Sequence, residues 1–225
     1  MTGFSLLDYA ALAVFGAAWA IYHFGVESTE AGGRSLNRVM NDYRHLWMER
    51  MLSRENRMID TSIMAALQNG TAFFASTSLI AVGGALTLLR SAEDVLTNLA
   101  GAPLGNAARL AWELKVIGLA VIFVYAFFKF AWSYRLFNYA AILMGAVPLH
   151  ADRDTAEAKA AVDRVACMHV VAGKHFNRGQ RAFFFALAYL GWFVSPWVFM
   201  AATGAVLYVI WRRQFASDAI AALGG

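Results

Sequence analysis

The sequence predicts an all-α fold, a multi-pass bundle of transmembrane helices. Of the 225 residues, 60% are hydrophobic and only 15% are charged, whereas a soluble domain typically carries about 45–50% apolar and about 25% charged residues. Several apolar runs reach the roughly 20 residues that a helix needs to cross the hydrocarbon core of a bilayer. We therefore interpret residues 1–225 as a single integral membrane domain surrounded by lipid.

Four apolar segments are predicted to span the membrane, at about residues 5–26, 59–89, 107–132 and 183–211. The second segment is longer than the hydrocarbon core, so its helix must tilt or project. The helical pattern of the third segment can continue to Val147 and would stop at Pro148. Pro196 lies near the middle of the last segment, where we expect it to kink the helix.

Two polar segments between the spans are predicted to form amphipathic helices on the cytoplasmic side. In the first, apolar residues from Leu36 through Tyr43 to Trp47 recur at helical spacing, which is typical of a helix lying on the membrane surface. In the second, apolar residues from Ala158 to Ala172 share one face. Its charged residues turn away from that face, as in a half-buried helix.

Lysine and arginine are concentrated in the same two segments. The first contains Arg34, Arg38, Arg44, Arg50, Arg54 and Arg57, and the second contains Arg135, Arg153, Lys159, Arg164, Lys174, Arg178 and Arg181. With four spans, both segments lie on one side of the membrane, which the positive-inside rule makes cytoplasmic. Both termini are then outside the cell, although Arg212 and Arg213 oppose this orientation.

Short motifs along the chain resemble the uncharacterised membrane family known as domain of unknown function 599. They are Trp47–Met51, Ile63–Asn69, Lys129–Asn138 with its Ser133-x-Arg135-x-x-Asn138 core, Arg178–Phe185, Trp192 and Pro196. The resemblance covers about residues 5–215. The family pattern has an arginine at the position of Gln68 and a proline near Ala188 or Tyr189. The resemblance implies the architecture but no activity, and with the lack of a transit peptide it favours a bacterial inner (plasma) membrane.

Arg50 and Arg54 fall on the same predicted helical stripe as Leu36, Tyr43 and Trp47. An arginine on an apolar face needs a partner, which could be a lipid phosphate, an acidic side chain or an anion in a cytoplasmic vestibule. The alternative is that the helix ends near Met51, so that the stripe is lost.

Other polar residues lie within the predicted spans. Gln68 and Asn69 could hydrogen-bond between helices or line a polar path. Glu113 could pair with Arg109, one helical turn before it, and Lys129 could extend its amine to the membrane surface. Arg135, Asn138 and Arg181 are interpreted as cytoplasmic packing residues or headgroup contacts.

No sequence motif indicates a metal site, a cofactor or an enzyme. His169 and His175 are six residues apart and point to different faces of a helix. HExxH, CxxC and glycine-rich phosphate-loop motifs are absent. The net charge of +4 does not suggest a nucleic-acid partner, because the cations cluster as they do for membrane orientation.

Three functions remain open at the level of sequence. The first is a homo-oligomeric channel or transport protein for an ion or small anion. The second is an accessory or scaffolding subunit of a larger membrane complex. The third is a lipid-binding or lipid-acting protein that uses the inner arginines on phosphate headgroups.

Overall fold

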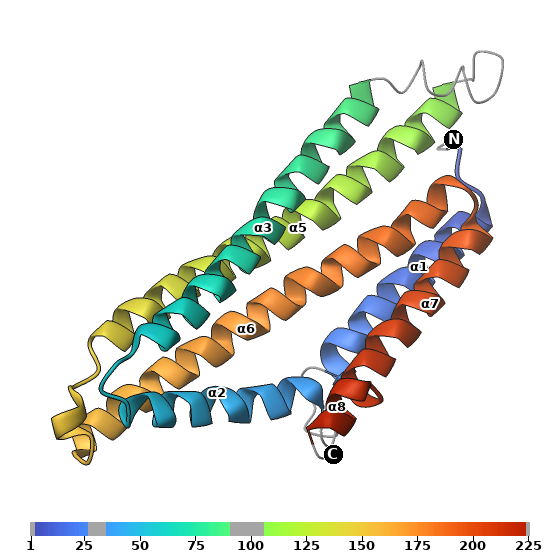
Figure 1. The fold of residues 1–225 in the computed structure, drawn as a ribbon. Coiled ribbons are helices and arrows are strands. Elements are labelled where there is room, and N and C mark those ends of the chain that lie inside the picture. The colour runs from blue at the N-terminus through green and yellow to red at the C-terminus, as the bar shows by residue number, and fades with distance from the viewer. Residues whose placement is uncertain (1–2, 27–34, 91–105, 224–225) are drawn as a thin grey trace.

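The chain is all-helical in the residues that its computed structural model describes, which are 3–26, 35–90 and 106–223. Arg34 of the first basic segment lies outside these residues. Five long helices run along the bundle, and α2 lies across one end of it (Figure 1). We call this end the α2 end and the opposite end the far end.

Within residues 3–26, 35–90 and 106–223, three helices are long and apolar enough to cross a membrane. They are α1, Leu6–Ile21, which continues into a π-helical turn at Tyr22–Val26; α3, Met58–Arg90; and α5, Asn106–Gly145. These helices match the first three predicted spans. The 40 residues of α5 make it about 60 Å long, and it ends shortly before Pro148, as the sequence predicts.

Helix α2, Leu36–Leu52, begins after the N-cap residue Ser35. Its buried residues are Met48, Met51 and Leu52, at its C-terminal end. Tyr43 is 46% exposed. The predicted apolar stripe from Leu36 to Trp47 therefore coincides only in part with the face of α2 that packs against the other helices. The fully buried side chains of the helix are therefore concentrated in its last two turns.

The second polar segment and the beginning of the predicted last span form one helix. After a short 3-10 turn at His150–Asp152, α6 runs from Ala156 to Leu190. Its first half carries the exposed side chains of Lys159, Asp163 and Arg164. The predicted amphipathic pattern is therefore present, but the helix does not stop before the apolar residues that follow.

The prediction of a single kinked helix at 183–211 is wrong, because the chain reverses direction within it. Helix α6 ends at Leu190, a 3-10 turn covers Gly191–Phe193, and α7 runs from Pro196 to Phe215. Pro196 is at the start of α7, after the N-cap Ser195, where a missing N–H costs nothing. A Cβ at Gly191 would lie 3.1 Å from the Val198 carbonyl oxygen and 3.2 Å from Phe199 Cα, closer than most Cβ contacts, so the tight reversal favours a glycine. The short helix α8, Asp218–Ala222, follows.

The reversal places the start of α1 and the end of α7 at opposite ends of the bundle (Figure 1). This arrangement does not favour the prediction that both termini lie outside the cell, which stays a prediction. Arg213 near the end of α7 lines the same pocket as Leu36 of α2. Arg212 and Arg213, which opposed the predicted orientation, thus lie at the end where the other basic residues gather.

Aromatic side chains fill the centre of the bundle between α3, α5 and α6. Phe130 is completely buried, and its ring centroid lies 5.3 Å from that of Phe74, 5.5 Å from that of Phe176 and 6.0 Å from that of Phe183. A second group, around Phe15, Phe185 and Phe199, packs α1 against α6 and α7. The core is therefore continuous from α3 to α1.

At the far end, a buried carboxylate holds the α6–α7 reversal. Asp8 completes a capping box with Ser5 at the start of α1. Its Oδ1 accepts a hydrogen bond of 2.8 Å from Trp192 Nε1, and Lys115 Nζ of α5 donates to the Trp192 carbonyl oxygen at 2.8 Å. These contacts join α1, α5 and the reversal.

Candidate functional site

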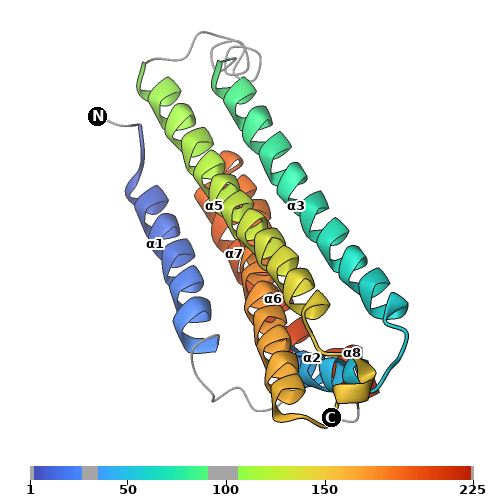
Figure 2. The same ribbon diagram turned by 90° about the vertical axis from the view of Figure 1, so that its left-hand side faces the viewer.

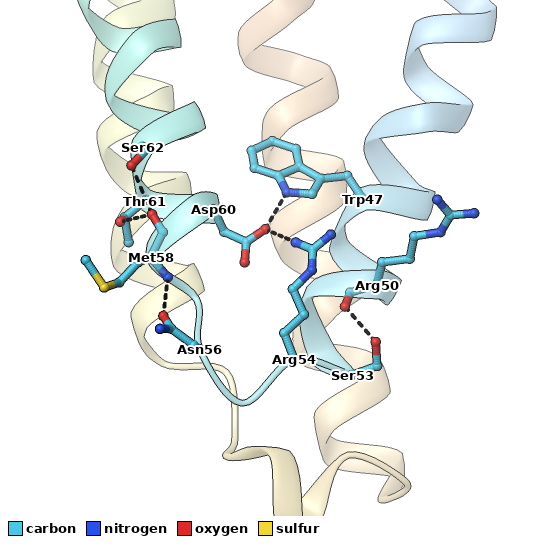
Figure 3. Close-up of polar contacts among 9 residues, drawn as sticks. All are labelled: Trp47, Arg50, Ser53, Arg54, Asn56, Met58, Asp60, Thr61 and Ser62. Carbon is cyan, nitrogen blue, oxygen red and sulfur yellow. Dashed lines mark hydrogen bonds and ion pairs between the residues drawn. The ribbon is translucent and has the colours of Figure 1, made fainter.

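A second buried carboxylate, Asp60, holds the α2 end together. Asp60 lies in the first turn of α3 and is completely buried. Its Oδ1 accepts a hydrogen bond of 2.7 Å from Trp47 Nε1 of α2 and forms an ion pair with Arg54, as Figure 3 shows. Its Oδ2 has no hydrogen-bond partner in the described part of the chain. A buried charge of this kind is tolerable because a cation and a donor reach it.

The segment between α2 and α3 also holds the end of α5. Arg57 donates to the carbonyl oxygens of Val147 and Pro148, at 3.0 Å and 2.5 Å. Because α2 ends at Leu52, Arg54 lies beyond the helix, so the alternative that the helix ends near Met51 and the stripe is lost is confirmed. Arg54 finds an acidic side chain as its partner, while the exposed Arg50 points away from Asp60 (Figure 3).

His169 of α6 is enclosed beside this carboxylate site. It is completely buried, and neither ring nitrogen has a hydrogen-bond partner among the described residues. Its ring centroid lies 4.9 Å from that of Trp47 and 5.8 Å from that of Phe137. Burial, and next the nearby Arg44 cation, lower the pKa of His169 from 6.5 to about 4, so the ring is neutral near pH 7.

Arg44 lies against α6, one helical turn from His169, because α6 has a glycine where α2 crosses it. A Cβ at Gly173 would lie 2.6 Å from Arg44 Nη2, so any larger residue would displace the guanidinium. Arg44 donates to Asn41 Oδ1 at 2.6 Å, and burial lowers its pKa. Sequence analysis did not single out Asp60, Arg44 or His169 as site residues. One sequence signal could have identified Asp60: it is an acidic residue in the first turn of a predicted helix, and several arginines precede it closely in the sequence.

The polar residues predicted within the spans do not come together at one site. Gln68 Nε2 donates to Asn138 Oδ1 at 2.7 Å, which joins α3 to α5. Asn69 is exposed on α3. Glu113 accepts from Arg109 Nε at 2.9 Å, near the far end. Gln68 and Glu113 thus make separate contacts within one chain, and a polar path stays a prediction.

Cations near the α2 end stack on aromatic rings. Lys129 Nζ lies 5.1 Å from the ring centroid of Tyr125, and Arg181 Cζ lies 5.2 Å from that of Tyr22. The exposed Arg135 donates to the Tyr139 hydroxyl at 2.6 Å. Of the predicted headgroup candidates, Arg181 therefore lies between helices, whereas Arg135 remains on the surface of α5.

Arg181 lines a pocket between the end of the α1 segment, α2, α6 and α7, which we call the basic pocket. Its volume is about 170 Å³. Arg213 Cζ lies over the Phe184 ring, 5.4 Å from its centroid, and supplies the second cation. Four amide side chains complete the polar lining: Asn37, Asn177, Gln180 and Gln214. None of the described residues that line it carries a carboxylate. Sequence analysis missed Arg213 because it did not predict the reversal that brings α7 here.

The sequence matches one family over nearly its whole length. The chain belongs to the family described as "Protein of unknown function, DUF599", with residues 10–219 matched. It has no significant match among curated proteins or among solved structures. The membership agrees with the resemblance seen in the motifs and assigns no activity.

Removing the Asp60 carboxylate should destabilise the fold. In Asp60→Ala the Trp47 indole N–H and the Arg54 guanidinium lose their shared acceptor. We expect the free energy of unfolding to fall by about 1–3 kcal/mol, because Arg54 is partly solvated and recovers some of the loss. Denaturant unfolding in detergent measures the change. Asp163→Ala, which removes an exposed carboxylate from α6, is the matched control, and an equal loss in both variants would contradict the role of Asp60.

His169 should make stability depend on pH. Its pKa is about 4 in the folded chain and near 6.5 when unfolded, so between these values the unfolded state binds the extra proton. Stability is therefore complete above about pH 6.5 and decreases as the pH falls toward 4, by about 1–3 kcal/mol. Melting temperatures of the wild type and His169→Leu from pH 7.5 to 4.5 test this. Equal pH slopes in the two proteins would show that His169 is not responsible.

Proposed function

We propose that this member of a family of unknown function is an integral membrane protein that binds a phosphate-bearing anion at its cytoplasmic α2 end. The basic pocket between Arg181 and Arg213 carries this proposal. The alternatives are a channel or transport protein and a scaffolding subunit. The filled aromatic centre around Phe130 favours the anion-binding function over a path through a single chain.

The distribution of basic residues supports the orientation. Arg38, Arg44, Arg50, Arg54 and Arg57 lie on or just after α2, and Arg212 and Arg213 lie at the same end on α7. Under the positive-inside rule this end is cytoplasmic. Because α6 and α7 run beside the three apolar helices (Figure 2), we infer five passes, with the start of α1 outside the cell and the end of α7 inside.

Cysteine labelling tests this topology. Cys167 is the chain's one cysteine and is exposed on α6, so a membrane-impermeant maleimide should reach it only from the cytoplasmic side. In the Cys167→Ser background, Arg212→Cys should react from the same side as Cys167, and Leu6→Cys should react from the opposite side. Labelling of positions 6 and 212 from one side would overturn the five-pass arrangement.

The chemistry of the basic pocket fits a phosphate group. A guanidinium can stack on a ring by its face and donate N–H groups to phosphate oxygens from its edge. The amides of Asn37, Asn177, Gln180 and Gln214 can donate further hydrogen bonds. The volume of about 170 Å³ corresponds to several water molecules, at about 30 Å³ each, and therefore admits a phosphate ester.

Calorimetric titration of the purified protein in detergent tests the pocket. The probes are inorganic phosphate, glycerol 3-phosphate and, in mixed micelles, phosphatidylglycerol, which together separate a free anion from a lipid headgroup. We expect Arg213→Gln to weaken binding about tenfold, because it removes charge-assisted hydrogen bonds. Arg164→Gln makes the same charge change at an exposed site on α6 and should bind as the wild type does. Equal affinity in Arg213→Gln and the wild type would refute the pocket.

A further inference from the structure

Helix α3 lies at the edge of the bundle and leaves one face uncovered (Figure 2). It packs mainly against α5. On the uncovered face, Phe73 and Ile80 are 64% and 74% exposed. No charged residue occurs between Asp60 and Arg90, so in the proposed orientation this face is turned toward lipid.

Small and polar residues form a row along the uncovered face, which we call the α3 row. They recur every seven residues and are all exposed: Ser62, Asn69, Ser76 and Gly83. A hydrocarbon core of about 30 Å, centred between Asp60 and Arg90, includes the last three of them. The α3 row therefore presents polar groups at a depth where lipid offers only acyl chains.

The exposed face of α5 shows what contact with lipid alone requires. Its residues at the same sevenfold spacing are Leu114, Val121 and Phe128, which are 41%, 61% and 65% exposed. All three are large and apolar, and they lie on the helix that packs beside α3 (Figure 2). The polar character of the α3 row is therefore not a general property of the outer surface of this bundle.

Two features of the α3 row have no explanation within one chain. Asn69 and Ser76 form no hydrogen bond with the described residues, and an acyl chain offers them no partner. No atom lies within 4 Å of the place where a Cβ at Gly83 would stand, so packing within the chain does not require this glycine, which is otherwise unfavourable in a helix. Unpaired polar groups and an open glycine are typical of a surface on which another membrane helix packs.

We propose that the uncovered face of α3 is the interface of a two-fold homodimer, in which α3 packs against α3 of a second copy. Two copies inserted in the same direction are related by an axis along the membrane normal. Each residue of the α3 row then faces its own counterpart. A repeat of seven residues keeps such a row in contact along the length of two supercoiled helices.

The residue types of the α3 row favour a second copy over a different protein. At a two-fold axis each side chain must be able to face itself. The amide of Asn69 and the hydroxyl of Ser76 each donate and accept hydrogen bonds, so each can bond to its own counterpart. Gly83 lets the two backbones approach closely. A charged side chain would repel its counterpart, and the face carries none between Asp60 and Arg90.

Disulfide cross-linking of the full chain in liposomes tests the interface. In the Cys167→Ser background, Ser76→Cys places a thiol in the α3 row. Phe128→Cys places one at a similar depth on the exposed face of α5, because the rings of Phe74 and Phe130 stack between the two helices. After mild oxidation at a low protein-to-lipid ratio, we expect about fivefold more covalent dimer for Ser76→Cys, since only its two sulfurs come within bonding reach.

Matched variants test the chemistry of the α3 row. Subunit counting by single-molecule photobleaching, over a series of lipid dilutions, gives the dissociation constant of the dimer. Asn69→Leu removes the amide pair and should raise this constant about three- to tenfold, whereas Asn69→Gln keeps a donor and an acceptor and should raise it less. Gly83→Leu separates the backbones and should abolish the dimer. Gly204→Leu on α7, where an added Cβ also meets no atom within 4 Å, should dimerise as the wild type does.

Three results would overturn the proposal. One is a wild type that stays monomeric at every lipid dilution. Another is equal cross-linking of Ser76→Cys and Phe128→Cys, which means random collision. The third is a dimer that neither Asn69→Leu nor Gly83→Leu weakens, which means contact through another face. The dimer and the anion site are tested separately, because no described residue of α3 lines the basic pocket.

Discussion

The reversal of the chain at Gly191 depends on a close approach between the turn and the first residues of α7. The Val198 carbonyl oxygen and the Phe199 backbone lie within 3.1–3.2 Å of where a Cβ at position 191 would stand, so a larger residue would push them apart. The reversal returns α7 along α1 and brings Arg213 to Arg181. Without it, α7 would extend away from the bundle, and the basic pocket would lack one wall and one of its two cations.

The same chemistry holds the bundle at both ends. Asp8 and Asp60 are both buried, each accepts a hydrogen bond from a tryptophan indole, and each has a cation beside it, Lys115 at 4.0 Å from Asp8 and Arg54 at Asp60. A carboxylate withdrawn from water needs both a donor and a counter-charge. Tryptophan supplies the donor together with a large apolar surface. Each end can therefore carry a fixed polar contact inside an otherwise apolar core.

The sequence predicted the apolar helices well because length and hydropathy report directly on solvation by lipid. The predicted span 59–89 differs from α3 by one position at each end. The span predicted at 107–132 begins one residue after the start of α5, and the helix continues beyond it toward Val147, as the helical pattern allowed. The reversal at Gly191 was missed because residues 183–211 are apolar on both sides of it, so no polar loop marks the turn. The local signals were Ser195 followed by Pro196, an N-cap and a first helical residue. These signals also fit a kink when a single spanning segment is assumed.

The candidate site was harder to predict because it depends on contacts between distant segments. Helical spacing placed Arg54 on a stripe with Arg50, but its partner, Asp60, belongs to another helix. Arg181 was identified among other surface cations, yet its importance depends on Tyr22 and Arg213. Helical periodicity describes one helix at a time, so it could not predict these contacts between residues of different helices. The expected homo-oligomer and membrane-complex partner stay predictions.

Helix α2 connects the buried carboxylate to the basic pocket. Its first residues, Leu36 and Asn37, line the pocket, and Asn37 accepts a hydrogen bond of 3.0 Å from Asn177 of α6. At its other end, Trp47 contacts both Asp60 and His169. The 17 residues from Leu36 to Leu52 form one continuous helix, about 25 Å long, so one element carries both the contact at Asp60 and part of the pocket lining. Both ends of α2 are therefore fixed by polar contacts, Trp47 to Asp60 at one end and Asn37 to Asn177 at the other.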